Sequence, residues 1–428
     1  MIPLQAEILS VGTELLLGEI TDTNAQYISA RLREIGVSVY RRETLGDNRS
    51  RLTGAFREAL GRASLVIATG GLGPTDDDVT AECLAAALGL PLEFHEGAWE
   101  DMLEWYRVRG RTPSPGDRKQ AMIIGGGIPF RNKVGTAPGQ AILTGGKLAC
   151  VLPGPPREMI PMFEEHLVPL IQSTFTDLVP LYIKNLKLTG IPEVKVGEMI
   201  RDLMDSANPT VAPYAGRGEI RIRIAAGSED LAEARKMVAQ VADEVKSRLR
   251  DYIYGEDDDT LESAVGEIMS RRGLSIATAE SVTGGLVAHR LTNVPGSSRY
   301  FKMGMVAYSP AIKATCLGVP DEAIWKDEAV NEETAVSMAS GVRTLAGAKI
   351  GLATTGFAGP TGGTEKEPVG TVYVAVSDED GTEVERFIYT GSRRDVKEYG
   401  AGRALYVLWR RLKRSRRKPQ GSKEGSGQ

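Results

Sequence analysis

Ala279-Glu280-Ser281-Val282-Thr283-Gly284-Gly285 is the segment on which the interpretation of this chain depends. It follows an apolar run at residues 274–279, typical of a buried strand, and precedes residues 286–291, whose apolar spacing predicts a helix. A strand, a turn with a hydroxyl group and two glycines, and then a helix is how α/β proteins present a reactive group. The glycines let a substrate approach the backbone, and the free N–H groups of the first helical turn attract anions.

Ser281 in this turn is a candidate nucleophile. The competing interpretation is that Ser281 or Thr283 only caps the following helix. The turn lacks the G-x-S-x-G pattern of the serine-hydrolase elbow, so the turn by itself does not establish catalysis.

The composition is that of a folded α/β protein. The 428 residues are enough for about three domains, and the 42% hydrophobic and 25% charged content is ordinary for globular chains. No apolar run approaches the roughly 18 residues of a membrane helix, and residues 1–7 lack the basic start of a signal peptide. The three cysteines, Cys83, Cys150 and Cys316, are far apart and have no metal-ligand spacing. We therefore expect reduced thiols, a cytoplasmic location and no membrane partner.

The net charge of −4 hides a basic tail. Residues 410–428 contain eight Lys and Arg against the single acidic Glu424. The composition predicts disorder beyond the last helix, at residues 415–428. No aromatic residue follows Trp409 to stack on bases, so we expect a solubilising tail and no nucleic-acid partner.

The first part of the chain alternates strands and helices. Apolar runs at 7–11, 37–45 and 64–69 predict strands, and the intervening patterns predict helices that end at Ile35 and Arg62. Short links between alternating elements are typical of a parallel sheet covered on both faces.

A glycine- and aspartate-rich loop at 69–80 follows the third of these strands, where open parallel sheets bind their ligands. Its glycines Gly70, Gly71 and Gly73 offer amides for a phosphate, and Asp76, Asp77 and Asp78 offer carboxylates for a hard cation. A solvated acidic helix start explains the same aspartates, and neither common nucleotide fingerprint is present. The residues alone leave both interpretations open.

The rest of the chain divides into two further units. From residue 181 the pattern is strand-helix-strand-strand-helix-strand, a small α+β unit with no visible chemistry, and residues 255–259 form the best linker. The last unit contains predicted strands at 301–308, 349–355 and 369–376, and helices at 332–345 and 395–412. A second glycine-rich loop, 356–363, follows one of these strands. Together with the turn at Ser281, this loop indicates a pocket for a small anionic molecule.

A serine nucleophile needs a partner that takes its proton. The chain has three histidines, His95, His166 and His289, and none is placed to serve Ser281. A Lys, a Tyr or a carboxylate remains, and Ser-Lys pairs are a known variant. The pKa of such a lysine must fall from about 10.4 toward 7–8 through burial or a nearby charge. Lys313, near apolar strands, is a candidate, although spacing alone does not select it.

Several motifs together resemble the bacterial competence- and damage-inducible CinA family, over essentially the whole chain except its tail. The N-terminal half is similar to the family's molybdopterin-binding-type fold through residues 10–18, 69–78 and 152–158. Residues 208–214 are similar to the family's middle domain. The last third is similar to its nicotinamide-nucleotide amidase domain through residues 279–285, 294–298 and 356–360.

The resemblance implies a Ser-Lys amidase that hydrolyses nicotinamide mononucleotide to nicotinic acid mononucleotide and ammonia. Ser281 would be the nucleophile and Lys313 the base, with Tyr308, Thr355 and Arg393 in supporting positions. The turn's amides would hold the oxyanion, and Arg393 or the loop from Gly356 would bind the 5′-phosphate. Substrate contacts are thus expected at these residues of the last domain: Thr283, Gly284, Gly285, Gly356 and Arg393.

The N-terminal half is similar to domains with a metal-dependent ADP-ribose pyrophosphatase activity. A divalent metal, Mg²⁺ or similar, would then bind Asp76, Asp77 and Asp78, with Gly70, Gly71 and Gly73 near the substrate. The amidase would need no cofactor.

Three departures from the family pattern stand out. Val282 replaces a usual Cys, Lys133 replaces a usual Pro, and residues 191–193 differ from the usual sequence of the middle domain. Only the last of these puts a function in doubt, that of the middle domain.

The predicted architecture is α/β throughout. We expect a three-layer α/β/α domain at 1–176, an α+β domain at 177–254, an α/β amidase domain at 258–414 and the tail at 415–428. The expected partners are the two nucleotides and a second copy of the chain in a homodimer. The alternative is a non-catalytic interaction protein of competence or DNA repair that carries a pterin-fold module.

Overall fold

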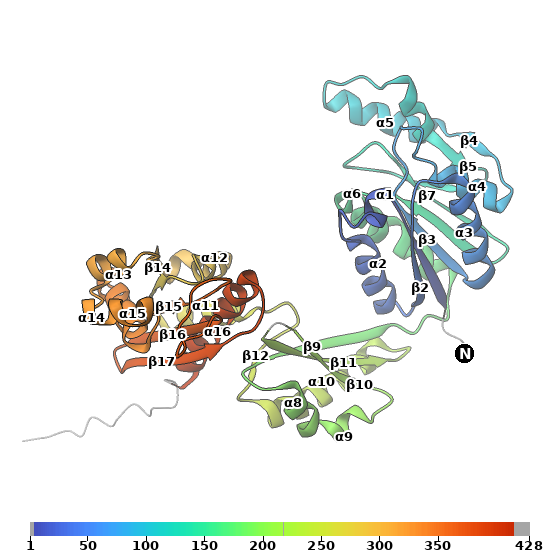
Figure 1. The fold of residues 1–428 in the computed structure, drawn as a ribbon. Coiled ribbons are helices and arrows are strands. Elements are labelled where there is room, and N and C mark those ends of the chain that lie inside the picture. The colour runs from blue at the N-terminus through green and yellow to red at the C-terminus, as the bar shows by residue number, and fades with distance from the viewer. Residues whose placement is uncertain (1–3, 217, 415–428) are drawn as a thin grey trace, which may run out of the picture. The chain divides into compact units, whose positions relative to one another are not determined.

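The computed structural model describes residues 4–216 and 218–414 (Figure 1). The predicted tail at 415–428 lies outside these residues. By its internal contacts the chain divides into two compact units, one formed by Met1–Ile183 with Ala225–Val238 and the other by Lys184–Ile224 with Ala239–Gln428. No helix in the described part of the chain is long and apolar enough to span a bilayer.

The N-terminal sheet has six strands in the order β2-β1-β3-β8-β7-β6. Pairing is parallel from β2 to β8, whereas β7 is antiparallel to both β8 and β6. The parallel pairing predicted from the first three strands is confirmed, whereas the antiparallel edge formed by β7 and β6 was not predicted. The cause is the connection Gly145-Gly146, whose positive φ angles of 55° and 75° close a two-residue hairpin between β7 and β8. The strand bounds are β1 Gln5–Val11, β2 Ser38–Leu45, β3 Leu65–Thr69, β6 Ile128–Phe130, β7 Gly139–Thr144 and β8 Lys147–Leu152.

Helices cover both faces of this sheet, which confirms the predicted three layers (Figure 1). Helices α2 (Thr23–Glu34), α6 (Pro156–Met162) and α7 (Val168–Thr174) pack on one face. Helices α3 (Arg49–Arg62) and α4 (Thr80–Leu88) pack on the other. Alternate residues of β1 supply the two cores, because successive side chains of a strand point to opposite faces. The remaining elements are α1 Thr13–Leu16, β4 Leu92–Phe94, α5 Glu96–Val108, a 3-10 helix Pro115–Ala121 and β5 Met122–Ile124.

The segment between the two larger sheets has the predicted α+β arrangement, with four strands in the order β10-β11-β9-β12. The helix predicted at 193–205 is interrupted at Ile200, a fully buried residue whose backbone (φ −121°, ψ 17°) leaves the helical region. The elements are β9 Leu181–Thr189, α8 Glu193–Met199, α9 Arg201–Met204, β10 Thr210–Ala215, β11 Glu219–Gly227, α10 Leu231–Leu249 and β12 Ile253–Glu256.

The C-terminal sheet has five strands in the order β14-β13-β15-β16-β17. Strand β13, next to the edge strand β14, is parallel to β14 and to the central strand β15, while β15, β16 and β17 form an antiparallel run. The sequence did not predict β17, an edge strand rich in charged residues. The bounds are β13 Ile276–Glu280, β14 Phe301–Val306, β15 Ile350–Gly356, β16 Thr371–Asp378 and β17 Gly381–Ile388.

Two helical layers cover this sheet. The first layer contains α11 (Leu261–Arg272), α12 (Leu286–Thr292) and α16 (Arg393–Arg414). The second contains α13 (Pro310–Leu317), α14 (Asp321–Trp325) and α15 (Glu332–Leu345). On β13, Ile276 packs in the first layer's core, whereas Ala277 and Ala279 pack in the second. This alternation decides which layer each residue of the following turn faces.

Candidate active sites

The turn that follows β13 has the predicted form. Strand β13 ends at Glu280, and α12 begins at Leu286. Ser281 continues the sheet pairing, because its amide donates a 2.9 Å hydrogen bond to the carbonyl oxygen of Thr354 on β15. The Ser281 side chain is 8% exposed. The serine is thus fixed by its backbone at the end of β13.

Glu280 organises the turn. Its side chain is 1% exposed and accepts hydrogen bonds from Thr283 Oγ1 (2.7 Å) and from three amides. These amides belong to Gly285 (2.9 Å), Val287 (3.0 Å) and Ala288 (2.8 Å), so the carboxylate holds the first turn of α12. The capping role that the sequence suggested for Ser281 or Thr283 therefore belongs to Glu280.

Glu280→Ala is expected to destabilise the C-terminal domain by about 3 kcal/mol, because it leaves several buried donors without an acceptor. The measurement is denaturant unfolding of the full chain, followed by circular dichroism. Glu267→Ala on α11 is the matched control, since Glu267 pairs with Arg271 on the surface and its loss should change little. Equal stability of the Glu280 variant and the wild type would contradict the assignment.

Two glycines let the chain reverse between Ser281 and α12. Gly284 (φ +61°) and Gly285 (φ +95°) occupy the left-handed region, which disfavours other residues. The amide of Gly284 donates to the Ser281 carbonyl (3.1 Å), and the hydroxyl of Thr283 lies between Glu280 and Thr354. The Thr283 hydroxyl and the amides of Gly284 and Gly285, which were expected near the substrate, are thus engaged inside the turn and shape it.

Two amides of the turn remain available. Across residues 4–216 and 218–414, the N–H groups of Val282 and Thr283 have no hydrogen-bond acceptor, whereas those of Ser281 and of residues 284–288 are all engaged. The residue after a nucleophile commonly supplies an oxyanion donor. The available pair therefore lies where an acyl-transfer reaction needs it.

Ser281 faces the second helical layer. The parallel register pairs Glu280 with Thr354, so Ser281 and Thr355 follow side by side on the face that Ala279 and Ala353 share. Lys313 lies on α13 in that layer, 3% exposed, and its Nζ donates to Thr355 Oγ1 at 3.4 Å. The structure thus brings Ser281, Lys313 and Thr355 to one face of the sheet.

The environment of Lys313 favours its neutral form. Burial lowers the pKa of its amine from 10.5 to about 8. Thr355 donates its own hydroxyl proton to the carbonyl oxygen of Ala329 (2.9 Å), so it can only accept from the lysine. Ala329 ends three consecutive left-handed residues, Asp327, Glu328 and Ala329, with φ angles of 48°, 53° and 61°. Such a backbone carries strain, which here directs a carbonyl group toward Thr355.

The remaining predicted residues of this domain form an adjacent cluster. Tyr308, 59% exposed, accepts a hydrogen bond from Arg393 (2.7 Å), and Arg393 also donates to the carbonyl oxygen of Gly359 (2.9 Å). Gly356 ends β15 and pairs with Val372. Arg393 therefore joins the start of α16 to the glycine-rich loop and to the segment after β14.

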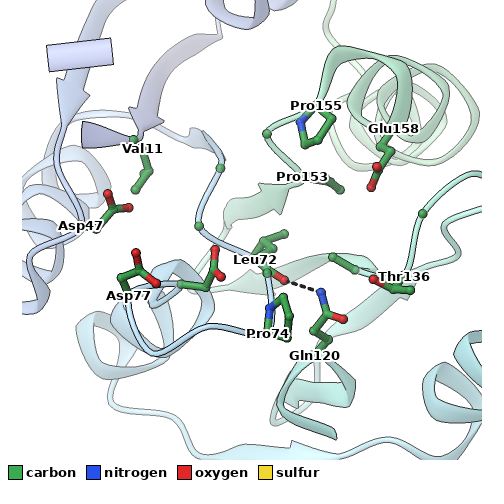
Figure 2. Close-up of a pocket in the computed structure, with 18 of the residues that line it drawn as sticks. Val11, Asp47, Leu72, Pro74, Asp77, Gln120, Thr136, Pro153, Pro155 and Glu158 are labelled. Atoms are coloured by element: carbon green, nitrogen blue, oxygen red, sulfur yellow. Dashed lines mark hydrogen bonds between the residues drawn. The ribbon is translucent and has the colours of Figure 1, made fainter. Parts of the chain in front are cut away.

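The N-terminal domain has a cavity of about 460 Å³ at the carboxyl ends of its parallel strands (Figure 2). Gly70, Gly71 and Gly73 line it, as predicted for the loop after β3. A side chain at Gly70 (φ +98°) would collide with the carbonyl oxygen of Val11, so the two loops can approach closely only with glycine there. Across residues 4–216 and 218–414, the amides of Leu72 and Gly73 have no acceptor, and they are suited to a phosphate.

Most of the charged side chains that line this cavity are carboxylates. Figure 2 shows Asp47 and Asp77 on one side and Glu158 on another. A hydrogen bond from Thr75 Oγ1, at 2.5 Å, and the Asp77 amide itself lower the pKa of the Asp77 carboxyl group. Arg157 is the only Lys or Arg of the described lining. The five acidic lining residues are Glu14, Asp47, Asp77, Asp78 and Glu158.

The three predicted metal ligands do not converge. Asp77 and Asp78 line the cavity, but Asp76 does not. Asp78 accepts a hydrogen bond from the Thr75 amide (3.0 Å). In the described part of the chain no group of three or more His, Cys, Asp or Glu is arranged to hold a metal ion. However, Mg²⁺ commonly binds one or two carboxylates together with substrate phosphates. The carboxylates of Asp77 and Asp78 therefore fit a divalent cation whose coordination shell is completed by a substrate phosphate.

Sequence reasoning missed several residues of both sites. Glu14, on the short helix α1 that follows β1, and Asp47, in the loop after β2, both line the N-terminal cavity, and only their place after strand ends could have indicated them. Glu280 belongs to the segment 279–285, but no role was predicted for it. The sequence did not single out Lys397 on α16, whose Nζ lies near Gly284.

Comparison with known families accounts for nearly all of the described chain. Residues 7–173 match the probable molybdopterin binding domain, residues 183–255 the damage-inducible protein CinA KH domain, and residues 258–412 the CinA C-terminal domain. A putative competence-damage inducible protein of Moorella thermoacetica is 44% identical over 410 residues, 96% of this chain and 99% of that protein.

A second curated relative and a solved structure are also similar to this chain. A CinA-like protein of Dictyoglomus thermophilum is also 44% identical over 410 residues, 96% of this chain and 99% of the relative. Among solved structures, CinA of unknown function from Thermoplasma acidophilum is 36% identical and covers 39% of this chain and 98% of its own, with a TM-score of 0.37.

Proposed function

This chain belongs to the CinA family of competence- and damage-inducible proteins, and we propose that its C-terminal domain hydrolyses nicotinamide mononucleotide to nicotinic acid mononucleotide and ammonia. The observation that carries the proposal is the buried Lys313, whose pKa is lowered to about 8 and whose Nζ contacts Thr355 beside Ser281. A buried lysine with no acidic partner in the described chain is costly, and catalysis gives a reason for it.

The proposed reaction is acyl transfer through a serine ester. Neutral Lys313 takes the proton of Ser281 as Oγ attacks the carboxamide carbon, which the pyridinium ring makes electrophilic. The amides of Val282 and Thr283 stabilise the oxyanion. Lys313 then protonates the departing nitrogen, ammonia leaves, and water hydrolyses the ester with the same lysine as base.

The reaction rate is expected to depend on pH through Lys313. A base must be unprotonated in the free enzyme, so kcat/KM should rise about tenfold per pH unit below a pKa of about 8 and level off above it. The measurement is kcat/KM between pH 6 and 9.5 at constant ionic strength. A profile that is flat across this range, or that falls with pH, would rule out Lys313 as the base.

The decisive test of the function is ammonia release from nicotinamide mononucleotide. Wild-type turnover should exceed that of Ser281→Ala, and the nicotinic acid mononucleotide formed should equal the ammonia released. Wild-type turnover no faster than the Ser281→Ala background would reject the amidase and favour a non-catalytic interaction protein. The predicted cytoplasmic location and homodimer remain predictions.

For the N-terminal domain we propose a second activity, metal-dependent hydrolysis of ADP-ribose to AMP and ribose 5-phosphate. The supporting observation is the cavity that combines the available amides of Leu72 and Gly73 with the carboxylates of Asp47, Asp77 and Asp78. A pyrophosphate in so acidic a cavity needs a cation to offset the repulsion. A bound divalent metal would also polarise the phosphoryl group.

A further inference from the structure

Lys397 lies on α16, one helical turn after Arg393. A Cβ built on Gly284 would lie 3.3 Å from Lys397 Nζ, so the ammonium group abuts the turn that carries Ser281. Lys397 is half-buried. Its cation therefore lies beside the exposed Gly284, at the edge of the turn that carries Ser281.

The neighbouring cations of α16 are already engaged. Arg393 donates to the Gly359 carbonyl and to the Tyr308 hydroxyl, and Arg394 pairs with Glu398 at 2.8 Å. Within residues 4–216 and 218–414, Lys397 has neither a hydrogen-bond acceptor nor an acidic partner. All three of its N–H donors are thus free for a ligand.

A lysine cation with no acidic partner attracts an anion that reaches the turn beside it. The proposed substrate carries one anionic group, its phosphomonoester, at the end away from the reacting carboxamide. Gly284 lies three residues after Ser281, so an anion held there is on the same turn as the nucleophile without occupying the oxyanion position at Val282 and Thr283.

We propose that Lys397 binds the phosphate of the substrate and makes the amidase selective for the nucleotide over the corresponding nucleoside. This inference rests on the proposed amidase function. It differs from the expectation that Arg393 is the phosphate ligand, because Arg393 is committed to joining the Gly359 loop and Tyr308. Arg393 then positions the pocket wall, and Lys397 supplies the specific charge.

The test compares nicotinamide mononucleotide with nicotinamide riboside, which lacks the phosphate. In Lys397→Met, KM for the nucleotide should rise roughly 10- to 100-fold while kcat changes little, because only binding of a remote group is lost. Hydrolysis of the riboside should be unaffected, so the preference for the nucleotide should collapse. Lys397→Arg should restore most of it. Arg394→Met, another α16 cation but one paired with Glu398, is the matched control and should behave as wild type.

A binding measurement separates this inference from the function on which it rests. Calorimetric titration of nicotinamide mononucleotide into Ser281→Ala, with and without Lys397→Met, should show the same 10- to 100-fold weakening. If the wild type releases no ammonia but this difference appears, the amidase proposal fails and the phosphate site stands. Equal affinities of the two variants, or an unchanged nucleotide preference in turnover, would overturn the role of Lys397.

Discussion

Ser281→Ala and Lys313→Ala should each reduce hydrolysis of nicotinamide mononucleotide by at least about 1,000-fold, to the background rate. The first change removes the atom that forms the ester, and the second removes the group that accepts its proton. The two side chains act as a unit, so the double variant should be no slower than either single variant. Ammonia release under saturating substrate is the measurement.

Two controls make this result specific. Lys302→Ala removes an exposed lysine of β14 whose one hydrogen-bond partner among the described residues is the Gly347 carbonyl oxygen, and it should retain wild-type activity. Circular dichroism should show that the Ser281 and Lys313 variants are folded. Substantial turnover by a folded Lys313→Ala would mean that another group is the base, and turnover by Ser281→Ala would exclude the serine ester.

The second large effect is expected in the N-terminal cavity. Asp77→Asn and Asp78→Asn should each lower AMP production from ADP-ribose roughly 100-fold, and a chelator should abolish it until a divalent metal is restored. Asp76→Asn should change little, because Asp76 is adjacent in sequence but does not line the cavity. Metal-dependent activity that survives both Asp77→Asn and Asp78→Asn would remove these carboxylates from the mechanism. Equal losses of activity in the Asp76, Asp77 and Asp78 variants would show that the charge of the loop matters rather than its geometry.

The sequence predicted the architecture because its signals were local. The apolar run before Ser281 and the helical spacing after it correspond to β13 and α12. The antiparallel edge of the N-terminal sheet was not predicted, because an apolar run does not show which way its strand points. The local signal for this edge is the Gly145-Gly146 pair, which forms the hairpin between β7 and β8. The charged edge strand β17 was missed because it is exposed and lacks an apolar run.

The sites were less predictable because they depend on contacts between distant residues. The run Asp76-Asp77-Asp78 looked like a ligand cluster, but only Asp77 and Asp78, which both accept from Thr75 Oγ1, line the cavity, and Asp47 joins them from another loop. The role of Glu280 arises only when the turn aims three amides at its carboxylate. Lys313 is buried because α13 packs in the second helical layer, and the spacing of residues along the sequence does not show which layer a helix joins. Lys313 was therefore selected as the candidate base by the family resemblance.

The two faces of β13 also bear on how this domain can acquire new substrates. Lys313 and Ser281 lie with the α13–α15 layer, whereas Lys397 belongs to α16 in the opposite layer and meets the turn at Gly284. Lys397 therefore lies on α16, whereas Lys313 lies on α13 and Ser281 lies in the turn after β13. A library randomised at position 397 alone can then be screened for amides with a different remote group while Lys313 and Arg393 keep their contacts, so ligand preference can be re-engineered from a helix that does not carry the proposed base.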